Sequence, residues 1–519
     1  MTCTDVFVGG RLGDLIVEAV ARYPDRVALV DVDGTEVTYS EMGARIARAM
    51  HRLSAIGLAS GEAVAQLSGN RVELFCVMAA AYIGGWCSVT LHPMNSAEDH
   101  AFVLRDSRAK VFISEDKYAG RAEELLGAGI DVPHWFSHDA DGVLPHFWSS
   151  AERAPLRAVG AAEDIIRIAY TGGTTGRPKG VMLCNRSLVT NTLLWLAGLP
   201  WPDAVRTLCS APITHGAGSL IYPTLVRGGR VVLQRGFDKD QWLQIVYQQR
   251  IQMTFIVPTM LYALLDHSAT RSTDLTSLVA LIYGAAPVSP AALKRALETF
   301  GPVLAQTYGQ SEAPNTVLLL TQAEHASADE RRLAAAGRPF PGIQVALLDD
   351  QHVPVAPGEV GEICVRGPLV MSGYRGLPEE TRAVLAGGWL HTGDLATRDD
   401  DGYFYVVDRK KDLIISGGFN VYPKEVEDAL MSHPGVSAAC VIGVPDEKWG
   451  EAVKAIVVRR VSVETTQQAL IDHVKLHKGA VCAPKTVDFV DQLPLTGLGK
   501  PDKKALRQKY WANAARAIA

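Results

Sequence analysis

The run from Tyr170 to Gly180 constrains this chain more than any other segment of its sequence. It reads Tyr-Thr-Gly-Gly-Thr-Thr-Gly-Arg-Pro-Lys-Gly, so three glycines and three threonines fill six consecutive positions ahead of the cation of Lys179. Glycines let backbone N–H groups turn toward an anion without a Cβ in the way, and hydroxyls add further donors. The apolar, β-branched stretch 164–170 before it predicts that the loop leaves the end of a strand. The segment therefore predicts a cradle for phosphate groups.

Two other interpretations of this loop have to be weighed. A Walker A motif needs a lysine directly after its last glycine and a serine or threonine after the lysine. Here Arg177 and Pro178 follow Gly176, and Gly180 follows Lys179, which argues against a P-loop NTPase. The remaining alternative is a flexible surface loop of glycine and threonine, because glycine clusters often mark only a turn.

Bulk composition bounds the class of protein. A chain of 519 residues predicts roughly two to four folding units. With 51 basic and 56 acidic side chains the net charge is −5, so nothing points to nucleic acid as a partner. The eight cysteines are scattered without a Cys-x-x-Cys pair, which favours reduced thiols over disulfides or zinc. No signal peptide or transmembrane segment is evident, and we expect a cytoplasmic protein.

Strand-like and helix-like segments alternate in the first two thirds of the chain, which predicts an α/β fold with parallel sheets. Thr38 and Glu41 fit a capping box ahead of an apolar helical face. The apolar stretch Cys76 to Ile83 is too short to span a bilayer and predicts a buried helix. The predicted strands are 111–114, 165–170, 230–233, 253–257 and 278–283.

The pattern changes after about Pro339. Short strands separated by Pro/Gly turns predict a smaller antiparallel unit, at 345–348, 359–366 and 403–407. From Lys411 on, a strand at 413–415, a helix at 423–432 and strands at 438–444 and 452–458 predict a compact α+β unit. We expect the domain boundary near 408–411.

Further motifs follow the threonine-glycine loop in a fixed order. They are Tyr-Gly-Ala-Ala-Pro at 283–287, Gln-Thr-Tyr-Gly-Gln-Ser-Glu-Ala at 306–313, Trp-Leu-His-Thr-Gly-Asp at 389–394, the stretch 408–423 that contains Ser-Gly-Gly-Phe-Asn, and Pro-Leu-Thr-Gly-Leu-Gly-Lys at 494–500. Each motif is weak alone, but the ordered set is specific. Together they resemble the adenylate-forming superfamily of acyl-CoA synthetases, luciferases and adenylation domains, from about Leu12 to the C-terminus.

The resemblance implies a fold and a reaction. The expected fold has a large N-terminal domain, residues 1–408, with two α/β subdomains and a small β-barrel. A mobile α+β C-terminal domain, residues 409–519, would follow a hinge near 409–411. The shared chemistry is attack of a carboxylate on the α-phosphate of ATP, release of pyrophosphate, and transfer of the acyl group. Because a carboxylate and a triphosphate repel each other, such a site must supply positive charge and hydrogen-bond donors.

The resemblance also implies roles for particular residues. The phosphate loop would comprise Thr171, Gly172, Gly173, Thr174, Thr175, Gly176 and Lys179. Glu312 would hold Mg²⁺, Ser311 would contact the α-phosphate, and Asp394 would bind the ribose with help from Arg409. The adenine slot would be lined by Gly284, Ala285, Ala286, Tyr308 and Gly309. In relatives a second serine or threonine is usual where this loop has Gly173.

Lys500 is the strongest single candidate for a catalytic residue. By resemblance its ammonium would reach the acyl carboxylate and the α-phosphate during adenylation. A unit charge pair at about 4 Å is worth roughly 4 kcal/mol at an effective dielectric near 20. Without the surrounding Thr496, Gly497 and Gly499, an exposed lysine on a terminal turn would be the simpler interpretation.

Four further residues would serve transfer to coenzyme A. Lys411 would be the hinge, after which Gly417 and Gly418 would line a pantetheine channel. Trp449 would contact CoA, although a tryptophan of the core explains this position almost as well. Relatives carry an aromatic and a basic residue where this chain has the 481–483 segment Val-Cys-Ala, so the nucleotide end of CoA lacks an obvious partner.

His215 matches a position that gates the acyl pocket, and we expect a gate or polar lining there, not a general base. A lone histidine is otherwise more often a structural hydrogen-bonding group. The combined prediction is a carboxylate–CoA ligase that uses ATP, Mg²⁺ and CoA on an apolar fatty, aromatic or polycyclic acid, with a possible homodimer. The alternatives are an adenylating enzyme with another acceptor, such as a carrier protein, and a nucleotide-binding relative without turnover.

Overall fold

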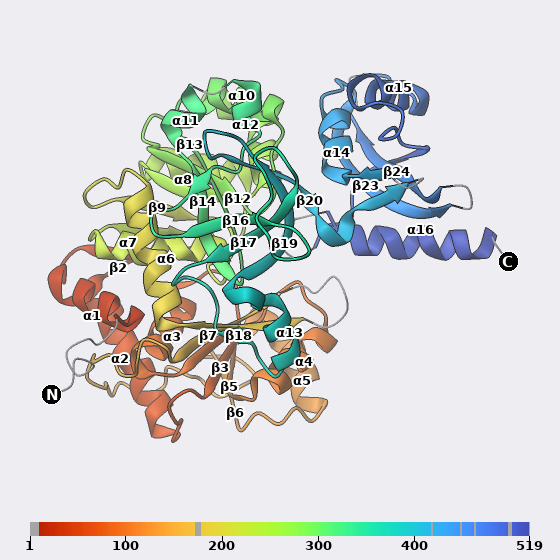
Figure 1. Ribbon diagram of the computed structural model, residues 1–519. Coiled ribbons are helices and arrows are strands. Elements are labelled where there is room, and N and C mark those ends of the chain that lie inside the picture. Colours follow the sequence, from red (N-terminus) through yellow and green to blue (C-terminus); the bar gives the residue numbers. More distant parts are fainter. Residues whose placement is uncertain are drawn as a thin grey trace.

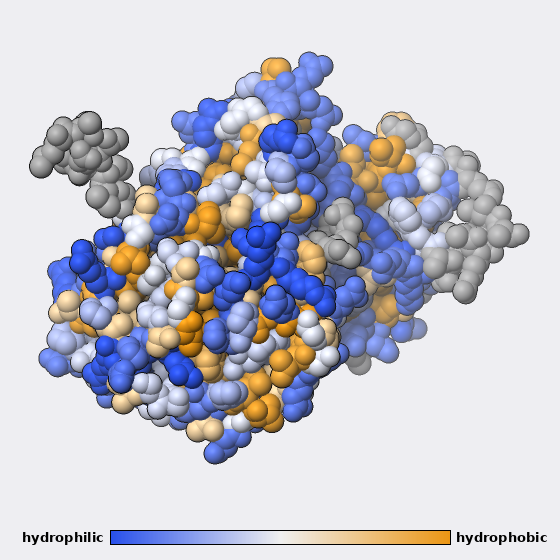
Figure 2. All heavy atoms as spheres, turned by 90° about the horizontal axis from the view of Figure 1, so that it is seen from below, coloured by the Kyte–Doolittle hydropathy of each residue, from blue (hydrophilic) through white to orange (hydrophobic). Residues whose placement is uncertain are grey.

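The computed structural model describes residues 10–171, 178–327, 329–416, 419–446, 449–460, 463–496 and 501–517, with backbone alone after residue 511. Figure 1 shows a large unit, coloured from red to teal, and a smaller blue unit beside it. Within the described residues, no helix combines the length and the apolar composition that crossing a membrane requires. From below, apolar residues form small separate patches among hydrophilic ones (Figure 2).

The first sheet of the large unit has seven strands in the order β18-β8-β7-β4-β3-β5-β6. Its members are β3 (Ala63–Leu67), β4 (Cys87–Thr90), β5 (Ala109–Ser114), β6 (His134–Ser137), β7 (Ile165–Thr171), β8 (Lys179–Cys184) and β18 (Gly373–Tyr374). The central five, β7 to β6, are parallel, whereas β8 and β18 run antiparallel to their neighbours. The helices that belong to this half are α4 (Ala97–Ser107) and α5 (Ala119–Gly127).

The second sheet has nine strands in the order β15-β14-β13-β12-β11-β9-β10-β1-β2. They are β1 (Val27–Val30), β2 (Glu36–Thr38), β9 (Arg206–Cys209), β10 (Arg230–Leu233), β11 (Met253–Ile256), β12 (Ala280–Gly284), β13 (Leu304–Gln310), β14 (Ala313–Leu320) and β15 (Arg338–Pro339). Six neighbouring strands, from β1 to β13, are parallel. The helices of this half are α8 (Lys239–Gln248), α9 (Pro258–Leu265), α10 (Pro290–Phe300), α11 (Gln322–Ala326) and α12 (Glu330–Leu333).

One hydrophobic core joins the two sheets, and helices fill the space between them. These helices are α1 (Leu12–Arg22), α2 (Tyr39–Ala55), α3 (Val72–Gly84), α6 (Asn185–Gly198) and α7 (Ile221–Val226). The predicted capping box is present at the start of α2, where Thr38 and Glu41 cap each other's backbone N–H groups. Helix α3 is buried over almost its whole surface, as its uniformly apolar sequence predicts.

The expected small β unit is a four-stranded antiparallel sheet in the order β16-β17-β19-β20. Its strands are β16 (Gln344–Leu348), β17 (Gly361–Arg366), β19 (Leu390–Arg398) and β20 (Phe404–Arg409), and α13 (Pro378–Val384) lies between β18 and β19 in the chain. Together with the two large sheets it gives the mixed α/β fold that was expected.

The smaller unit is an α+β structure built on a separate sheet, with the order β22-β21-β24-β23 and β25 paired in parallel with β24. The strands are β21 (Ile414–Ser416), β22 (Phe419–Val421), β23 (Val436–Asp446), β24 (Gly450–Arg459) and β25 (Thr486–Val490). The helices are α14 (Pro423–Met431), α15 (Gln467–Lys478) and α16 (Lys503–Ala517). This unit has its own hydrophobic core, made by α14, α15 and the sheet.

Helix α16 is fastened by ion pairs to residues around the connection between the two units. Lys503 Nζ lies 3.0 Å from Glu427 Oε1, and Arg507 Nη1 lies 2.8 Å from Asp412 Oδ1. Although burial alone would lower the pKa of Lys503, Glu427 and Asp408 raise it above its usual value. The start of α16 is therefore held by half-buried opposite charges.

Replacing Lys503 with Met should destabilise the smaller unit by about 2–3 kcal/mol, because Glu427 would remain largely buried without its cation. Lys475, exposed on α15, offers a matched control, and Lys475→Met should change stability by less than about 0.5 kcal/mol. Urea denaturation followed by circular dichroism and limited proteolysis would measure both variants. Equal midpoints for Lys503→Met and wild type would contradict the clamp.

Candidate active site

A cleft of about 1720 Å³ lies where the two large sheets, the small sheet and the smaller unit meet. The carboxyl ends of the parallel strands of both large sheets open onto it, through residues 68–70 after β3, 91–95 after β4, 210–212 and 214–217 after β9, and 285–287 after β12. Ligands of open α/β sheets bind at this edge of the strands. The fold therefore places one large site at the meeting point of all its units.

Most of the described site residues predicted from the sequence line this cleft. They are Thr171, Lys179, His215, Ala285, Ala286, Tyr308, Gly309, Ser311, Glu312, Asp394, Arg409 and Lys411. Gly172, Gly173, Thr174, Thr175, Gly176, Gly417, Gly418 and Lys500 lie outside the described residues.

Two predicted residues lie elsewhere. Gly284 is absent from the cleft lining and pairs with Thr307 of β13, where an added Cβ would come 2.6 Å from the Thr307 carbonyl oxygen. Trp449 is about one third exposed on the smaller unit, and Lys485 Nζ lies 5.1 Å from its ring centroid. The interpretation of Trp449 as a buried core residue was therefore wrong.

The two ends of the threonine-glycine loop are held side by side. Thr171, the last residue of β7, pairs across the antiparallel ladder with Lys179, the first residue of β8. The Tyr170 hydroxyl donates to Asp106 at 2.7 Å, which ties the end of β7 to α4. Lys179 Nζ lies 5.0 Å from the ring centroid of Tyr374, so its ammonium is kept at the cleft wall.

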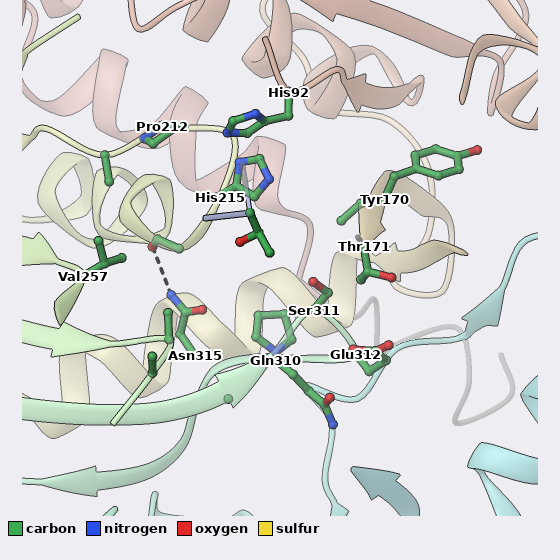
Figure 3. Close-up of a pocket in the computed structure, with 18 of the residues that line it drawn as sticks. His92, Tyr170, Thr171, Pro212, His215, Val257, Gln310, Ser311, Glu312 and Asn315 are labelled. Carbon is green, nitrogen blue, oxygen red and sulfur yellow. Dashed lines mark hydrogen bonds between the residues drawn. The ribbon is translucent and has the colours of Figure 1, made fainter. Parts of the chain in front are cut away.

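Glu312 is a buried carboxylate in the short turn between β13 and β14. Its Oε1 accepts a hydrogen bond from the Tyr374 hydroxyl at 2.8 Å, and burial together with this carboxylate raises the pKa of Tyr374. Figure 3 shows Glu312 and Thr171 on the same side of the pocket. Magnesium is commonly held by one or two carboxylates together with substrate phosphates, and Glu312 beside the loop end fits that arrangement.

A second acidic group also lines the cleft and joins three strands. Asp394 of β19 accepts a hydrogen bond from the Tyr308 hydroxyl of β13 at 2.6 Å. Its other oxygen lies 2.9 Å from Nε of Arg409, the last residue of β20. The Asp394 carboxylate is the main cause of the raised pKa of Arg409, and burial is the main cause of the raised pKa of Tyr308.

The backbone at the end of β12 is strained where the adenine slot was expected. Ala285 has a φ of 70°, in the left-handed region that costs an alanine about 1–2 kcal/mol. Residues in such conformations cluster at binding sites because the surrounding structure must hold them. Ala285 and Ala286 both line the cleft, so the strained turn faces the site.

His215 lies deep in the cleft next to a second histidine. The two rings lie next to each other (Figure 3), with the centroid of His215 5.2 Å from that of His92. The Thr214 hydroxyl is 2.9 Å from Nδ1 of His215. Burial, followed by His92 and Arg167, lowers the pKa of His215 to about 3. Burial also lowers the pKa of His92. The pair is therefore neutral at physiological pH.

His92 and Tyr374 were not singled out from the sequence. His92 follows the end of β4, and a polar residue after a parallel strand is a usable signal for a site at that edge. Tyr374 reaches Glu312 from a short strand 62 residues away, and no motif surrounds it.

The connection between the units also opens onto the cleft. Lys411 lies in the short helical turn Lys410–Asp412 directly after β20, and burial followed by Arg409 lowers the pKa of its ammonium group. Thr496 and Pro501, which flank the undescribed residues 497–500, both line the cleft. The described residues on either side of this segment therefore lie at the site.

One group of three potential metal ligands occurs in the described part of the chain, formed by Glu362, Cys364 and His391. His391 Nδ1 lies 3.3 Å from both Cys364 Sγ and Glu362 Oε2, and Lys410 Nζ lies 3.6 Å from that oxygen. The lysine already balances the carboxylate, so the cluster is explained by hydrogen bonds and an ion pair. Of the cysteines that the structure describes, all seven are free thiols, six buried and Cys482 half-buried.

A buried carboxylate beside the ends of a threonine-glycine loop, and a second acid paired with an arginine in the same cleft, are the features expected of a nucleotide-dependent enzyme of the α/β class. The family model of AMP-binding enzymes matches residues 16–375, and the model of the AMP-binding enzyme C-terminal domain matches residues 425–500. The chain belongs to the AMP-binding enzyme family.

Similar proteins cover nearly the whole chain. It is 43% identical to the medium/long-chain-fatty-acid–CoA ligase FadD8 of Mycobacterium tuberculosis, over 98% of this chain and 91% of that protein. It is 39% identical to a feruloyl-CoA synthase of an Amycolatopsis species, over 94% of this chain and 97% of that protein. Among solved structures, the amide bond synthetase McbA from Marinactinospora thermotolerans superposes with a TM-score of 0.89 at 33% identity, over 96% of this chain and all of that one.

The neutral state of His215 leads to a prediction about pH dependence. Its folded-state pKa lies below the ordinary 6.5, so the folded protein keeps the ring neutral as the pH falls through that value. Pyrophosphate release measured from about pH 5 to about pH 8.5 should therefore keep the same pH profile after His215→Asn, with a change in rate alone. An acid limb near pH 6–7 that is present in wild type and lost in the variant would show instead that His215 titrates during the reaction.

Proposed function

We propose that the chain is an ATP-dependent carboxylate–CoA ligase that first forms an acyl-adenylate and then an acyl-CoA thioester. In the first step a carboxylate oxygen attacks the α-phosphorus of ATP, and pyrophosphate leaves. In the second step the CoA thiol attacks the acyl carbon, and AMP leaves. The AMP-forming acid–thiol ligase activity agrees with the two family models and with the most similar relatives.

The observation that carries this proposal is the convergence of three groups on one cleft. The ends of the threonine-glycine loop, the Glu312 carboxylate and the Asp394–Arg409 pair all face the same space. Attack of one anion on another needs positive charge and hydrogen-bond donors arranged in advance, and a cleft of this construction supplies them.

Each group has a role in this proposal. The loop from Thr171 to Lys179 would hold the β- and γ-phosphates, and Ser311 would contact the α-phosphate. Glu312 would hold magnesium, which when bound neutralises charge on the phosphates. Asp394 would accept hydrogen bonds from the ribose hydroxyls, and Arg409 keeps that carboxylate oriented through their 2.9 Å contact.

We assign residues 1–408 to an N-terminal domain and 409–519 to a C-terminal domain, with the hinge at 409–411. Strand β20 ends at Arg409 in the small sheet of the large unit, and β21 begins at Ile414 in the sheet of the smaller unit. That arrangement supports a pivot at Lys411. Lys500 would stabilise the reacting carboxylate and α-phosphate before the smaller unit turns to admit the thiol.

Transfer to CoA would use residues of the cleft and of the smaller unit. His215, half-buried and neutral, would act as a gate near the acyl group, and Gly417 with Gly418 would line the path of pantetheine. The exposed ring of Trp449 with Lys485 beside it suits the base and phosphates of a nucleotide. A homodimer stays a prediction.

A panel of fatty and aromatic acids tests this function directly. With ATP and Mg²⁺, at least one acid should give pyrophosphate without CoA, and addition of CoA should produce AMP and a thioester in equal amounts. Pyrophosphate without thioester would favour another acceptor, such as a carrier protein. Binding of ATP without pyrophosphate from any acid would identify a nucleotide-binding relative without turnover.

Lys500→Ala should slow adenylate formation by about 10²–10³-fold, comparable to the loss of one oxyanion donor. Thioester formation from a pre-made acyl-adenylate should change far less, since the ammonium acts in the first step. Single-turnover assays of the two half-reactions measure both effects, with Lys475→Met as the exposed control. Equal slowing of both half-reactions would refute this role for Lys500.

A further inference from the structure

One polar side chain stands out on the wall of the cleft beside His215. Asn315, on β14, lines the cleft and has a φ of 51°, a left-handed conformation that asparagine tolerates better than most residues. The neighbouring strand accommodates it with a glycine, because a Cβ on Gly309 would come 2.5 Å from the Asn315 backbone nitrogen. The local backbone is therefore shaped to hold this residue.

The hydrogen bonds around Asn315 determine which way its amide points. Nδ2 donates to the Gly216 carbonyl at 3.0 Å and to the Ser219 hydroxyl oxygen at 2.9 Å. The Ser219 hydroxyl in turn donates to the same carbonyl at 2.6 Å and accepts from Trp195 Nε1 at 3.1 Å. Both N–H groups of the Asn315 amide therefore have acceptors, and the Ser219 hydroxyl donates one hydrogen bond and accepts two. A flipped amide would direct its oxygen at a carbonyl oxygen, which is repulsive.

The amide oxygen of Asn315 is consequently the group of this network that is left for a ligand. Figure 3 shows it on the side of the amide turned away from the hydrogen bond to residue 216, toward the interior of the pocket. The surrounding lining is largely apolar and aromatic, and includes Ala217, Tyr222, Phe255, Val257 and Met260. A fixed acceptor thus faces a pocket that otherwise suits hydrocarbon.

Such an acceptor discriminates among carboxylic acids by whether they carry a hydrogen-bond donor that can reach it. An alkyl chain would displace water from Oδ1 and return no hydrogen bond, which leaves a buried acceptor unpaired. A ring hydroxyl would replace the water with a donor while its ring packs against Tyr222 and Phe255. A rigid ring also holds its hydroxyl at a set distance from the carboxylate, so little conformational entropy is lost on binding.

We propose that Oδ1 of Asn315 selects hydroxylated aryl carboxylic acids over unsubstituted fatty acids in the acyl pocket of this ligase. The inference rests on the proposed function and names the substrate class for it. Asn315 determines specificity here and takes no part in the phosphoryl chemistry.

The wild-type enzyme provides the first test, through acids that differ in a single donor. We expect kcat/KM for 4-hydroxycinnamic acid, from pyrophosphate release, to exceed the values for 4-methoxycinnamic and cinnamic acid by about tenfold or more. Octanoic acid should be used less well still. Equal values for the hydroxylated and methoxylated acids, or a preference for octanoic acid, would overturn the inference.

A pair of variants then assigns the selectivity to Oδ1. Asn315→Gly keeps the left-handed backbone and removes the amide, and should reduce the hydroxyl preference to within about threefold. Ser219→Ala removes a polar group of the same network but leaves Oδ1 in place, and should keep the preference. An unchanged preference in Asn315→Gly with a wild-type melting temperature would refute the assignment. Release of pyrophosphate from every acid alike would overturn this inference alone, whereas no release from any acid would overturn the proposed function.

Discussion

The contact of Asp394 with Arg409 and Tyr308 organises the rest of the structure. Each of its three members belongs to a different strand, and two of those strands lie in the small sheet while the third lies in the nine-stranded sheet. A buried carboxylate needs charged or donor partners, since leaving it alone in a poorly solvated place is costly. Because Arg409 ends β20, the same pairing also fixes the last residue before the connection to the smaller unit. The Asp394 carboxylate of the cleft and the start of the connection between the units are thereby one electrostatic unit.

Much of the architecture could be predicted from local patterns in the sequence. Alternating apolar strands and helices, the capping box of Thr38 and Glu41 and the apolar run of α3 each depend on neighbours in the chain. The order of the motifs indicated where the strands end, and those ends define the cleft. Local periodicity is readable because backbone geometry repeats every two or 3.6 residues.

The partners of the site residues could not be predicted in this way. Glu312 meets Tyr374 and Asp394 meets Tyr308 across long stretches of chain, and such meetings depend on the path of the whole fold. His92 beside His215 is another pair of this kind, and the neutrality of both rings follows from burial that no motif records. Gly284 belonged to a predicted motif, yet it serves strand packing because β13 comes too close for a side chain. Trp449 shows the opposite case, where a residue type typical of cores is exposed beside Lys485.

The distribution of thiols has a practical consequence for testing whether the smaller unit moves. Six of the seven described cysteines are buried, whereas Cys482 is half-buried on the smaller unit and lies next to the exposed Val481. With Cys3 exchanged, a maleimide fluorophore would attach preferentially at that one position. Its emission would then report whether the surroundings of the smaller unit change as each reactant arrives, with Cys3 as the only position exchanged.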